Sequence, residues 1–239
     1  MSLPFFFEEN LPTRPSLALS EDTSRHIKQV LRMQKGEQLQ VTNGKGQVFT
    51  AEIISASKKA TEVKILSTDN RQESTKITIA ISLVKNNARF EWFLEKATEI
   101  GVSEIIPLIC ERTEKQHFRY DRMKGILKSA MLQSQQAWLP LLHEPVKFTE
   151  VVKKALHQYK YIAYCTKEEK KPLSNETFSG KQSLELCDKL ILIGPEGDFS
   201  KNEIEEALKN NFIAVALGST RLRTETAGVV AAVLLNNNY

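Results

Sequence analysis

The stretch of sequence at residues 190–208, LILIGPEGDFSKNEIEEAL, decides the class of fold. Its first four residues are apolar and predict a buried strand, whereas the amphipathic pattern that follows Ser200 predicts a helix. The turn between them is Gly-Pro-Glu-Gly, at residues 194–197. A glycine at the end of a buried strand either allows a tight strand-to-helix turn or lets a ligand approach the backbone, and both possibilities stay open at this point.

The same alternation of strands and helices extends on both sides of this stretch. Expected strands are 76–84, 102–110, 161–165, 189–194 and 213–218, and expected helices are 89–101, 119–137, 148–159, 200–211 and 224–237. The strands are almost continuously apolar, which predicts an α/β fold whose parallel sheet is covered on both faces. Ligands of such sheets bind beyond the carboxyl ends of the strands.

The first 70 residues have a different pattern. Short alternating runs at 38–42, 47–57 and 61–68 are joined by turn sequences, which predicts a small antiparallel sheet or barrel. Before them, Ser20 suits the N-cap of a helix that places Ile27, Val30 and Leu31 on one face and ends near Gly36. Because residues 67–75 are polar and indicate a linker, we expect two domains, 1–70 and 76–239.

Composition excludes several classes of protein. The chain has 239 residues, 41% hydrophobic and 26% charged, which is typical of a globular protein. It has no apolar run long enough to cross a bilayer and its first residues lack a signal-peptide pattern, so we expect a cytoplasmic protein without membrane contact. Three cysteines and four histidines are scattered without metal-ligand spacing, so we expect neither a disulfide framework nor a metal site.

Positive charge is concentrated between residues 112 and 128. The net charge of the chain is only +4, but this segment has six lysines and arginines against two acids. The basic side chains are Arg112, Lys115, Arg119, Arg122, Lys124 and Lys128. Such a segment either follows a phosphate backbone or forms a solvated helix face.

A second strand end carries charged residues, in the segment LGSTRLRTETA at 217–227. Neither this segment nor the 194–197 turn has a glycine-rich nucleotide fingerprint, so we expect a ligand that is not held by its phosphates. Arg221 and Arg223 stay protonated and can stabilise anions but cannot act as bases. Glu225 could be a base, a partner that orients an arginine, or a first-turn carboxylate favoured by the helix dipole.

These motifs closely resemble a known family. LILIGPEGDFSKNEIEEA at 190–207 and VALGSTRLRTETAGVVAA at 215–232 resemble the C-terminal signature of the ribosomal RNA small subunit methyltransferase E family, in the SPOUT superfamily. HIKQVLRM at 26–33, with KGE at 35–37, resembles the start of the family's PUA-like domain. EWFLEKATEIGVSEIIPLICERT at 91–113 resembles the start of its methyltransferase domain, so the likeness covers most of the chain in the family's order.

The resemblance implies a fold, a reaction and partners. The fold would be a PUA-like β-barrel followed by a SPOUT-type α/β domain with a deep trefoil knot. The reaction would be S-adenosylmethionine-dependent methylation of N3 of a uridine, with 16S ribosomal RNA or the small ribosomal subunit as substrate. SPOUT enzymes generally work as homodimers, and the apolar helix expected at 224–237 suits a two-fold interface. Burial of that helix within one chain is the alternative.

The resemblance also assigns roles to residues. Arg223 and Glu225 would face the uridine as catalytic residues, with Glu225, Glu196 or solvent as the base. The cofactor would be lined by Ile193, Gly194, Glu196, Gly197, Leu217, Gly218, Leu222 and Thr226. From the positive charge and the expected barrel, rather than from the resemblance, the candidate RNA contacts are His26, Arg32, Arg112, Lys115, Arg119 and Arg122. For His26 and Arg32, a solvated helix face is the alternative.

The chain departs from the family pattern at two places. Gln135 and Gln136 stand where the family has a Gly-Arg pair, and Asp198 stands where a second glycine is common. Both departures leave cofactor binding intact and affect local contacts with RNA. Three other functions stay open for this sequence. The protein could be a non-catalytic RNA-binding protein, a nucleotide-dependent α/β enzyme, or a methyltransferase with another target nucleotide.

Overall fold

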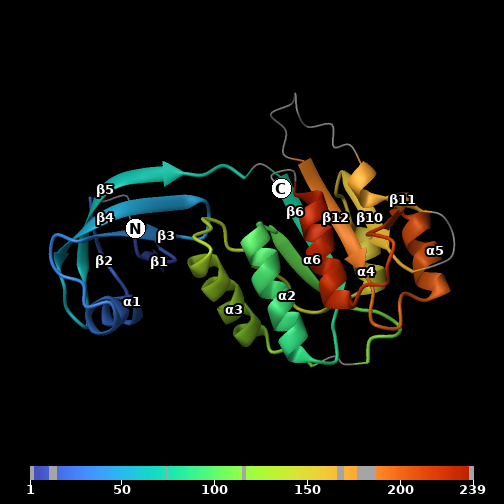
Figure 1. Ribbon diagram of the computed structural model, residues 1–239, viewed down its shortest axis with the longest axis horizontal. Coiled ribbons are helices and arrows are strands. Elements are labelled where there is room, and N and C mark those ends of the chain that lie inside the picture. Colours follow the sequence, from blue (N-terminus) through green and yellow to red (C-terminus); the bar gives the residue numbers. More distant parts are fainter. Residues whose placement is uncertain are drawn as a thin grey trace. The chain divides into compact units, whose positions relative to one another are not determined.

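The computed structural model describes residues 3–10, 15–73, 75–114, 117–165, 170–176 and 187–236 (Figure 1). The chain divides into two compact units. The first comprises Met1–Gln72 and Met131–Leu139, and the second comprises Glu73–Ala130 and Pro140–Tyr239. None of the helices in the described ranges combines the length and the apolar character that crossing a bilayer requires.

The first unit contains a five-stranded sheet with the order β1-β3-β4-β5-β2. Its strands are β1 (Phe5–Phe7), β2 (Ser16–Ala18), β3 (Gln38–Thr42), β4 (Gln47–Ser55) and β5 (Glu62–Asn70). All neighbours are antiparallel except β1 and β3, which confirms the hairpin pattern. The linker predicted at 67–75 is wrong at its start, because Ser67–Asn70 pair with β4 as part of β5. The side chains in this part of β5 are polar and exposed, so composition alone does not distinguish the strand from a linker.

The helix before this sheet is shorter than predicted. Ser20 is the N-cap of α1 (Glu21–Arg25), as predicted, and its Oγ accepts from the Thr23 amide at 3.4 Å. A π-helical turn, η1 (His26–Val30), then ends the helix well before Gly36. The predicted apolar face is wrong, because Ile27 is buried whereas Val30 is 65% exposed. The wider π turn changes the angular spacing on which the expected face depended.

The second unit contains an all-parallel sheet with the order β11-β13-β10-β12-β6-β7-β8, and β9 also pairs with β7. The strands are β6 (Thr75–Ser82), β7 (Glu104–Ile109), β8 (Leu141–Leu142), β9 (Val146–Lys147), β10 (Tyr159–Ala163), β11 (Lys171–Pro172), β12 (Cys187–Ile193) and β13 (Ile213–Ala216). The mixed α/β class and the parallel sheet are therefore confirmed.

Helices cover both faces of this sheet (Figure 1). The helices described between residues 75 and 236 are α2 (Asn87–Ile100), α3 (Tyr120–Gln133), α4 (Phe148–Lys154), α5 (Lys201–Lys209) and α6 (Thr224–Leu235), with a short 3-10 turn at Leu173–Asn175. On one face, Ala80 and Leu190 pack with Phe148 of α4 and Ala207 of α5. On the other face, α6 packs against β6 and β12, and α2 lies beside α6. Successive strand residues point to opposite faces, so both layers need apolar strands.

Helix α6 approaches α2 closely at Gly228. A Cβ added at this glycine would lie 2.6 Å from the Phe93 ring of α2 and 2.8 Å from Cδ1 of Ile81 in β6. Real Cβ atoms do not come this close to their neighbours. Only a residue without a side chain therefore lets the N-terminal half of α6 pack against both elements.

A buried lysine anchors the other end of α6. Lys189 of β12 is fully buried, and its Nζ donates to the carbonyl of Leu235, the last residue of α6, at 2.7 Å. A cation at a helix C-terminus is favoured by the exposed carbonyl dipoles. Desolvation nevertheless dominates and lowers the pKa of the Lys189 ammonium from 10.5 to about 8.

This lysine predicts a pH dependence of stability. Between about pH 8 and 10.5 the unfolded chain keeps a proton on Lys189 that the folded chain has lost, so the free energy of unfolding should rise with pH across this window. The full gain is roughly 3 kcal/mol. Urea unfolding at pH 7.5 and pH 10 measures it, with Lys189→Met as the control that should flatten the rise. Equal slopes in both proteins would contradict the prediction.

Candidate functional site

A cavity of about 710 Å³ opens at the carboxyl ends of β10, β12 and β13. This is the edge at which parallel sheets bind ligands, and the volume falls in the range of small-molecule sites. The lining comes from the last residues of these three strands and from the segments that follow them. The lining residues are Ala163, Tyr164, Cys165, Lys170, Ile193, Gly194, Pro195, Glu196, Asp198, 215–224 and Ala227.

The 194–197 turn after β12 is held from inside the fold. The buried hydroxyl of Thr224, the first residue of α6, donates to the carbonyl of Gly194 at 3.0 Å. A Cβ at Gly194 would lie 3.1 Å from the Phe199 ring and 3.2 Å from its amide nitrogen, so a side chain here would press on the same loop. The glycine therefore serves the close packing of the turn as well as access to the backbone.

Asp198 explains one departure from the family pattern. Its backbone has φ of +63°, a left-handed conformation that usually favours glycine. The side chain compensates, because Oδ1 accepts from the Phe199 amide at 2.9 Å and Oδ2 accepts from the Cys165 amide at 2.8 Å. The carboxylate thus links the segment after β12 to the segment after β10, which glycine could not do.

The segment at 217–223 forms the other wall of the cavity. Arg221 Nη2 donates to the carbonyl of Glu196 at 3.3 Å, so the two walls are linked by a second hydrogen bond. Arg223 is exposed, lines the cavity and is the N-cap residue of α6 without a side-chain cap.

The two predicted catalytic residues have different surroundings. Glu225 follows Arg223 by two positions but is buried and is not among the lining residues. Its Oε1 lies 3.7 Å from Nε of Arg89 in α2, and its Oε2 has no hydrogen-bond partner within the described part of the chain. Of the roles considered for Glu225, the geometry favours pairing with an arginine, and that arginine is Arg89.

The structure brings together six of the eight predicted cofactor residues. Ile193, Gly194, Glu196, Leu217, Gly218 and Leu222 all line the cavity, whereas Gly197 and Thr226 do not. Sequence reasoning missed Tyr164, Cys165, Lys170 and Thr224. The first two are the last residues of the expected strand at 161–165, so the rule that ligands bind at the carboxyl ends of parallel strands could have identified them. Lys170 had no signal in the sequence.

The predicted RNA-contacting residues of the second unit differ in whether they already bind other groups of the protein. Arg119 is exposed, and Lys115 lies outside the described residues. Arg122 forms a bidentate ion pair with Glu91 of α2, with Nε–Oε1 at 2.6 Å and Nη2–Oε2 at 2.9 Å. This hydrogen-bonded guanidinium lowers the pKa of the Glu91 carboxyl. Arg112 donates to the carbonyl of Gly197 at 2.7 Å, within the second unit. Arg122 and Arg112 therefore have partners inside the fold.

The two predicted contacts in the first unit are exposed. His26 lies in the π turn, with its ring edge-on to Phe6 at a centroid distance of 6.0 Å. Arg32 has φ of +56°, a conformation uncommon for residues other than glycine. Arg32 directly follows Leu31, the C-cap of η1, and the amide of Met33 donates to the carbonyl of Ile27 at 3.1 Å, so this left-handed residue ends the helical segment.

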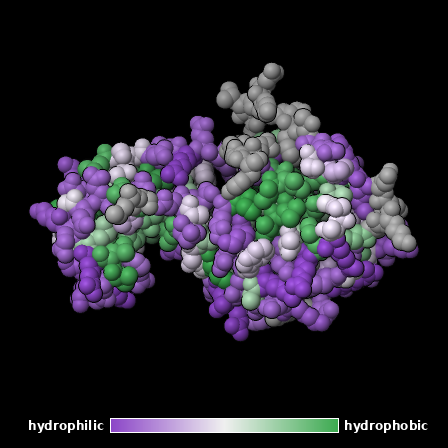
Figure 2. Space-filling model, in the orientation of Figure 1, coloured by the Kyte–Doolittle hydropathy of each residue, from purple (hydrophilic) through white to green (hydrophobic). Residues whose placement is uncertain are grey.

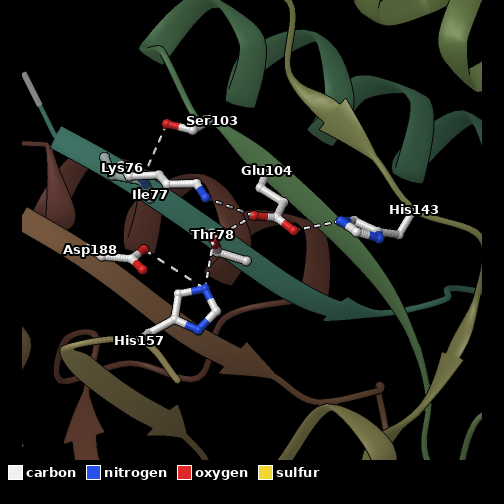
Figure 3. Close-up of polar contacts among 8 residues, drawn as sticks. All are labelled: Lys76, Ile77, Thr78, Ser103, Glu104, His143, His157 and Asp188. Atoms are coloured by element: carbon white, nitrogen blue, oxygen red, sulfur yellow. Dashed lines mark hydrogen bonds and ion pairs between the residues drawn. The ribbon is translucent and has the colours of Figure 1, made fainter. Parts of the chain in front are cut away.

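A second polar cluster lies toward the amino ends of β6, β7 and β12 (Figure 3). The Glu104 carboxylate accepts from the Thr78 hydroxyl at 3.3 Å and lies beside the His143 ring. His157 Nε2 lies 3.2 Å from the same hydroxyl and 3.8 Å from Asp188 Oδ1. Burial lowers the pKa of His157, which favours its neutral form.

This cluster is distinct from the cavity. It contains none of the residues predicted for a site, and the cavity is at the carboxyl ends of the strands. Within the described ranges, no three histidine, cysteine, aspartate or glutamate side chains are placed to hold a metal ion. The cluster links three strands and the segments that carry His143 and His157, which is a structural role.

Comparison with known proteins agrees with this geometry. A family model described as an RNA methyltransferase domain matches residues 71–236, and one described as an RNA methyltransferase PUA domain matches residues 19–66. The chain is 37% identical to a probable rRNA-methyltransferase from Porphyromonas gingivalis, with a TM-score of 0.86 over 96% of this chain and 95% of that one.

Two further relatives bear the name Ribosomal RNA small subunit methyltransferase E. The structure of the Neisseria gonorrhoeae protein, bound to S-adenosyl methionine, is 27% identical, with a TM-score of 0.82 over 100% of this chain and 98% of that one. The Synechocystis sp. protein is 28% identical over 92% of this chain and 73% of its own length.

Proposed function

Because the chain belongs to the RNA methyltransferase family in which a PUA domain precedes the catalytic domain, we propose that it methylates N3 of a uridine in 16S ribosomal RNA, with S-adenosylmethionine as methyl donor. The resemblance to ribosomal RNA small subunit methyltransferase E is confirmed by its relatives. A single observation carries the proposal: the cavity opens between two linked loops that follow parallel strands, and Arg223 lines it. A ribosomal substrate would make the protein cytoplasmic.

The residues of the cavity fit S-adenosylmethionine. Ile193, Leu217 and Leu222 offer an apolar surface for the adenine ring and the methionine chain, and the backbone at Gly194 and Gly218 offers polar groups that can bind adenine edges. No phosphate cradle is needed for this ligand, which agrees with the missing nucleotide fingerprints. When bound, the cofactor supplies a methyl group on a positively charged sulfur.

Arg223 would stabilise the target base. Methylation at N3 requires loss of the imide proton of uridine, which leaves negative charge spread over N3 and two carbonyl oxygens. A guanidinium at the cavity favours this anion and cannot itself accept the proton. The target nucleotide must be unpaired or turned out of its stack, because its N3 is otherwise engaged in base pairing.

Glu196 is the side chain best placed to accept the proton. It is exposed and lines the cavity, whereas Glu225 is buried and lies beside Arg89. Transfer to solvent through Glu196 would leave Glu225 with a positioning role, holding the start of α6 against α2. Glu196→Gln should therefore lower the rate of methylation and change its pH profile, since the amide cannot accept a proton.

Mapping of ribosomal RNA tests the proposed reaction. Primer extension on 16S RNA from a strain that lacks the gene should lose one stop caused by N3-methyluridine, and the purified protein with S-adenosylmethionine should restore it. Calorimetric titration separates the rivals. A non-catalytic RNA-binding protein should show no saturable heat with S-adenosylmethionine, and a nucleotide-dependent enzyme should instead respond to ATP or NAD.

RNA binding gives a prediction for Arg119. Because this side chain is exposed whereas Arg112 and Arg122 have partners inside the fold, Arg119→Gln should weaken RNA binding. The slope of log affinity against log salt concentration should become shallower by about 0.7 to 0.9 for one lost phosphate contact. Filter binding at several salt concentrations measures the slope. An unchanged slope would exclude Arg119 from the RNA-binding surface.

We propose a homodimer that uses α6. Gly228, Ala231, Ala232 and Leu235 of this helix are buried within the chain, but Val233 is 39% exposed. Figure 2 shows apolar surface gathered over this helix. Exposed apolar patches on a folded protein mark interaction sites, and a two-fold interface uses the same patch on both copies. Sedimentation should give the mass of a dimer, and Val233→Asp should shift it to that of a monomer.

We also propose that the second unit is knotted. Strand β13 lies beyond β10, away from β12, but α6, which follows β13, packs against β6 and β12. The 217–223 segment must therefore return across the sheet end, where it meets the 194–197 turn. Pulling the two ends of the chain apart should leave an unfolded length shorter than the full contour, because a tightened knot retains chain.

A further inference from the structure

We infer that Arg112 is a positioning residue that holds the cofactor-binding loop in shape. The inference rests on the proposed function, and it replaces the expectation that Arg112 contacts RNA. Nη1 of Arg112 donates to the carbonyl of Gly197 at 2.7 Å and lies 3.5 Å from the carbonyl of Phe199. One guanidinium nitrogen thus contacts the loop at two residues.

Arg112 acts on the side of the loop that does not line the cavity. Gly194, Pro195, Glu196 and Asp198 line the cavity, whereas Gly197 and Phe199 do not. The aliphatic part of Arg112 also packs along the loop, because a Cβ added at Gly197 would lie 3.4 Å from Cδ of Arg112. The loop is therefore supported from behind by a side chain that a bound ligand would not displace.

The segment that carries Arg112 is itself fixed to the loop. The buried carboxylate of Glu203 accepts from the amide of Glu111 through Oε1 and from the amide of Ser200 through Oε2, both at 2.8 Å. Thr113 Oγ1 in turn accepts from the amide of Cys110 at 2.9 Å. Arg112 thus extends from a backbone held by these hydrogen bonds, and the segment that follows β7 supports the segment that follows β12.

Such support should increase affinity for the cofactor. A loop that is mobile before binding must lose conformational freedom when the ligand binds, and a loop already held in its bound form does not. The contact between the guanidinium and a backbone carbonyl is charge-assisted, which makes it stronger than a neutral hydrogen bond. Its loss should weaken S-adenosylmethionine binding by about tenfold.

Calorimetry with S-adenosylmethionine, combined with RNA binding, tests the inference. Arg112→Ala should raise the Kd and KM for S-adenosylmethionine about tenfold, lower kcat by a smaller factor, and leave the salt dependence of RNA binding unchanged. Arg112→Lys should recover part of the affinity, because its ammonium can still donate. Lys201→Ala is the matched control, since it removes an exposed cation beside the same loop and should leave the Kd unchanged.

Two outcomes would overturn the inference. An unchanged Kd for S-adenosylmethionine in Arg112→Ala would do so, and a shallower salt slope with normal cofactor binding would return Arg112 to the RNA-binding surface. If Arg112→Ala does not fold, Arg112→Gln keeps most of the packing on Gly197 and is judged by the same two measurements. Failure of the wild-type protein to bind S-adenosylmethionine would instead reject the proposed function.

Discussion

Replacing Arg223 with alanine is expected to lower the turnover of RNA methylation by about 100-fold or more. Arg223 is the cavity-lining side chain to which we assign stabilisation of the uridine anion, and donors aimed at developing charge contribute roughly 3 to 4 kcal/mol each. The loss should fall on kcat, because the anion exists only on the way to product. Single-turnover kinetics with saturating RNA and S-adenosylmethionine measure it.

Two controls define the role of Arg223. Arg223→Lys keeps the charge but loses the planar fork of donors, so its turnover should lie between those of the wild type and Arg223→Ala. Binding of S-adenosylmethionine and RNA should stay within a few-fold of wild type in both variants. Wild-type turnover in Arg223→Ala, with both substrates bound normally, would reject the assignment.

Gly228→Val is expected to give the largest loss of stability. The added side chain would overlap the Phe93 ring and Ile81, whose atoms already lie 2.6 and 2.8 Å from the position of a Cβ. Overpacking of a dense core costs about 1 to 3 kcal/mol and sometimes more. Denaturant unfolding measures the cost. Activity should fall as well, because α6 begins at the residues that support the cavity.

A matched pair of alanine substitutions isolates the clash. Gly125 lies in α3, and a Cβ there would meet nothing within 4 Å. Gly125→Ala should therefore gain up to about 1 kcal/mol from helix propensity, whereas Gly228→Ala should lose stability despite the same intrinsic gain. Similar effects of the two substitutions would show that α6 can move away from α2 without cost.

The sequence predicted those parts of the fold that depend on local pattern. Continuous apolar runs such as 190–193 identified the parallel strands, because both faces of these strands are buried. Gly101 was expected to end α2, and its φ of +91° fits that role. The face of the first helix was not predictable in this way, since the π turn at His26–Val30 changes the spacing on which the pattern depends.

The candidate site was predictable only where it lies at strand ends. The 194–197 and 217–222 segments lie at the ends of expected strands, and five residues expected there line the cavity together with Ile193, the last residue of β12. The partners of the charged residues were not predictable, because they come from distant parts of the chain. Arg122 pairs with Glu91, Glu225 lies beside Arg89, and Arg112 binds the carbonyl of Gly197. Charge counts over 112–128 cannot separate a phosphate contact from such internal pairs.

The hydrogen bond between Thr224 and Gly194 sets a condition on product release. It joins the two walls of the cavity, and the contact between Arg221 and Glu196 joins them again. The demethylated product, S-adenosylhomocysteine, must therefore leave either while both hydrogen bonds stay formed or after both of them break. In the second case, product inhibition and the rate of successive turnovers would depend on how fast these two contacts break, rather than on methyl transfer to the RNA.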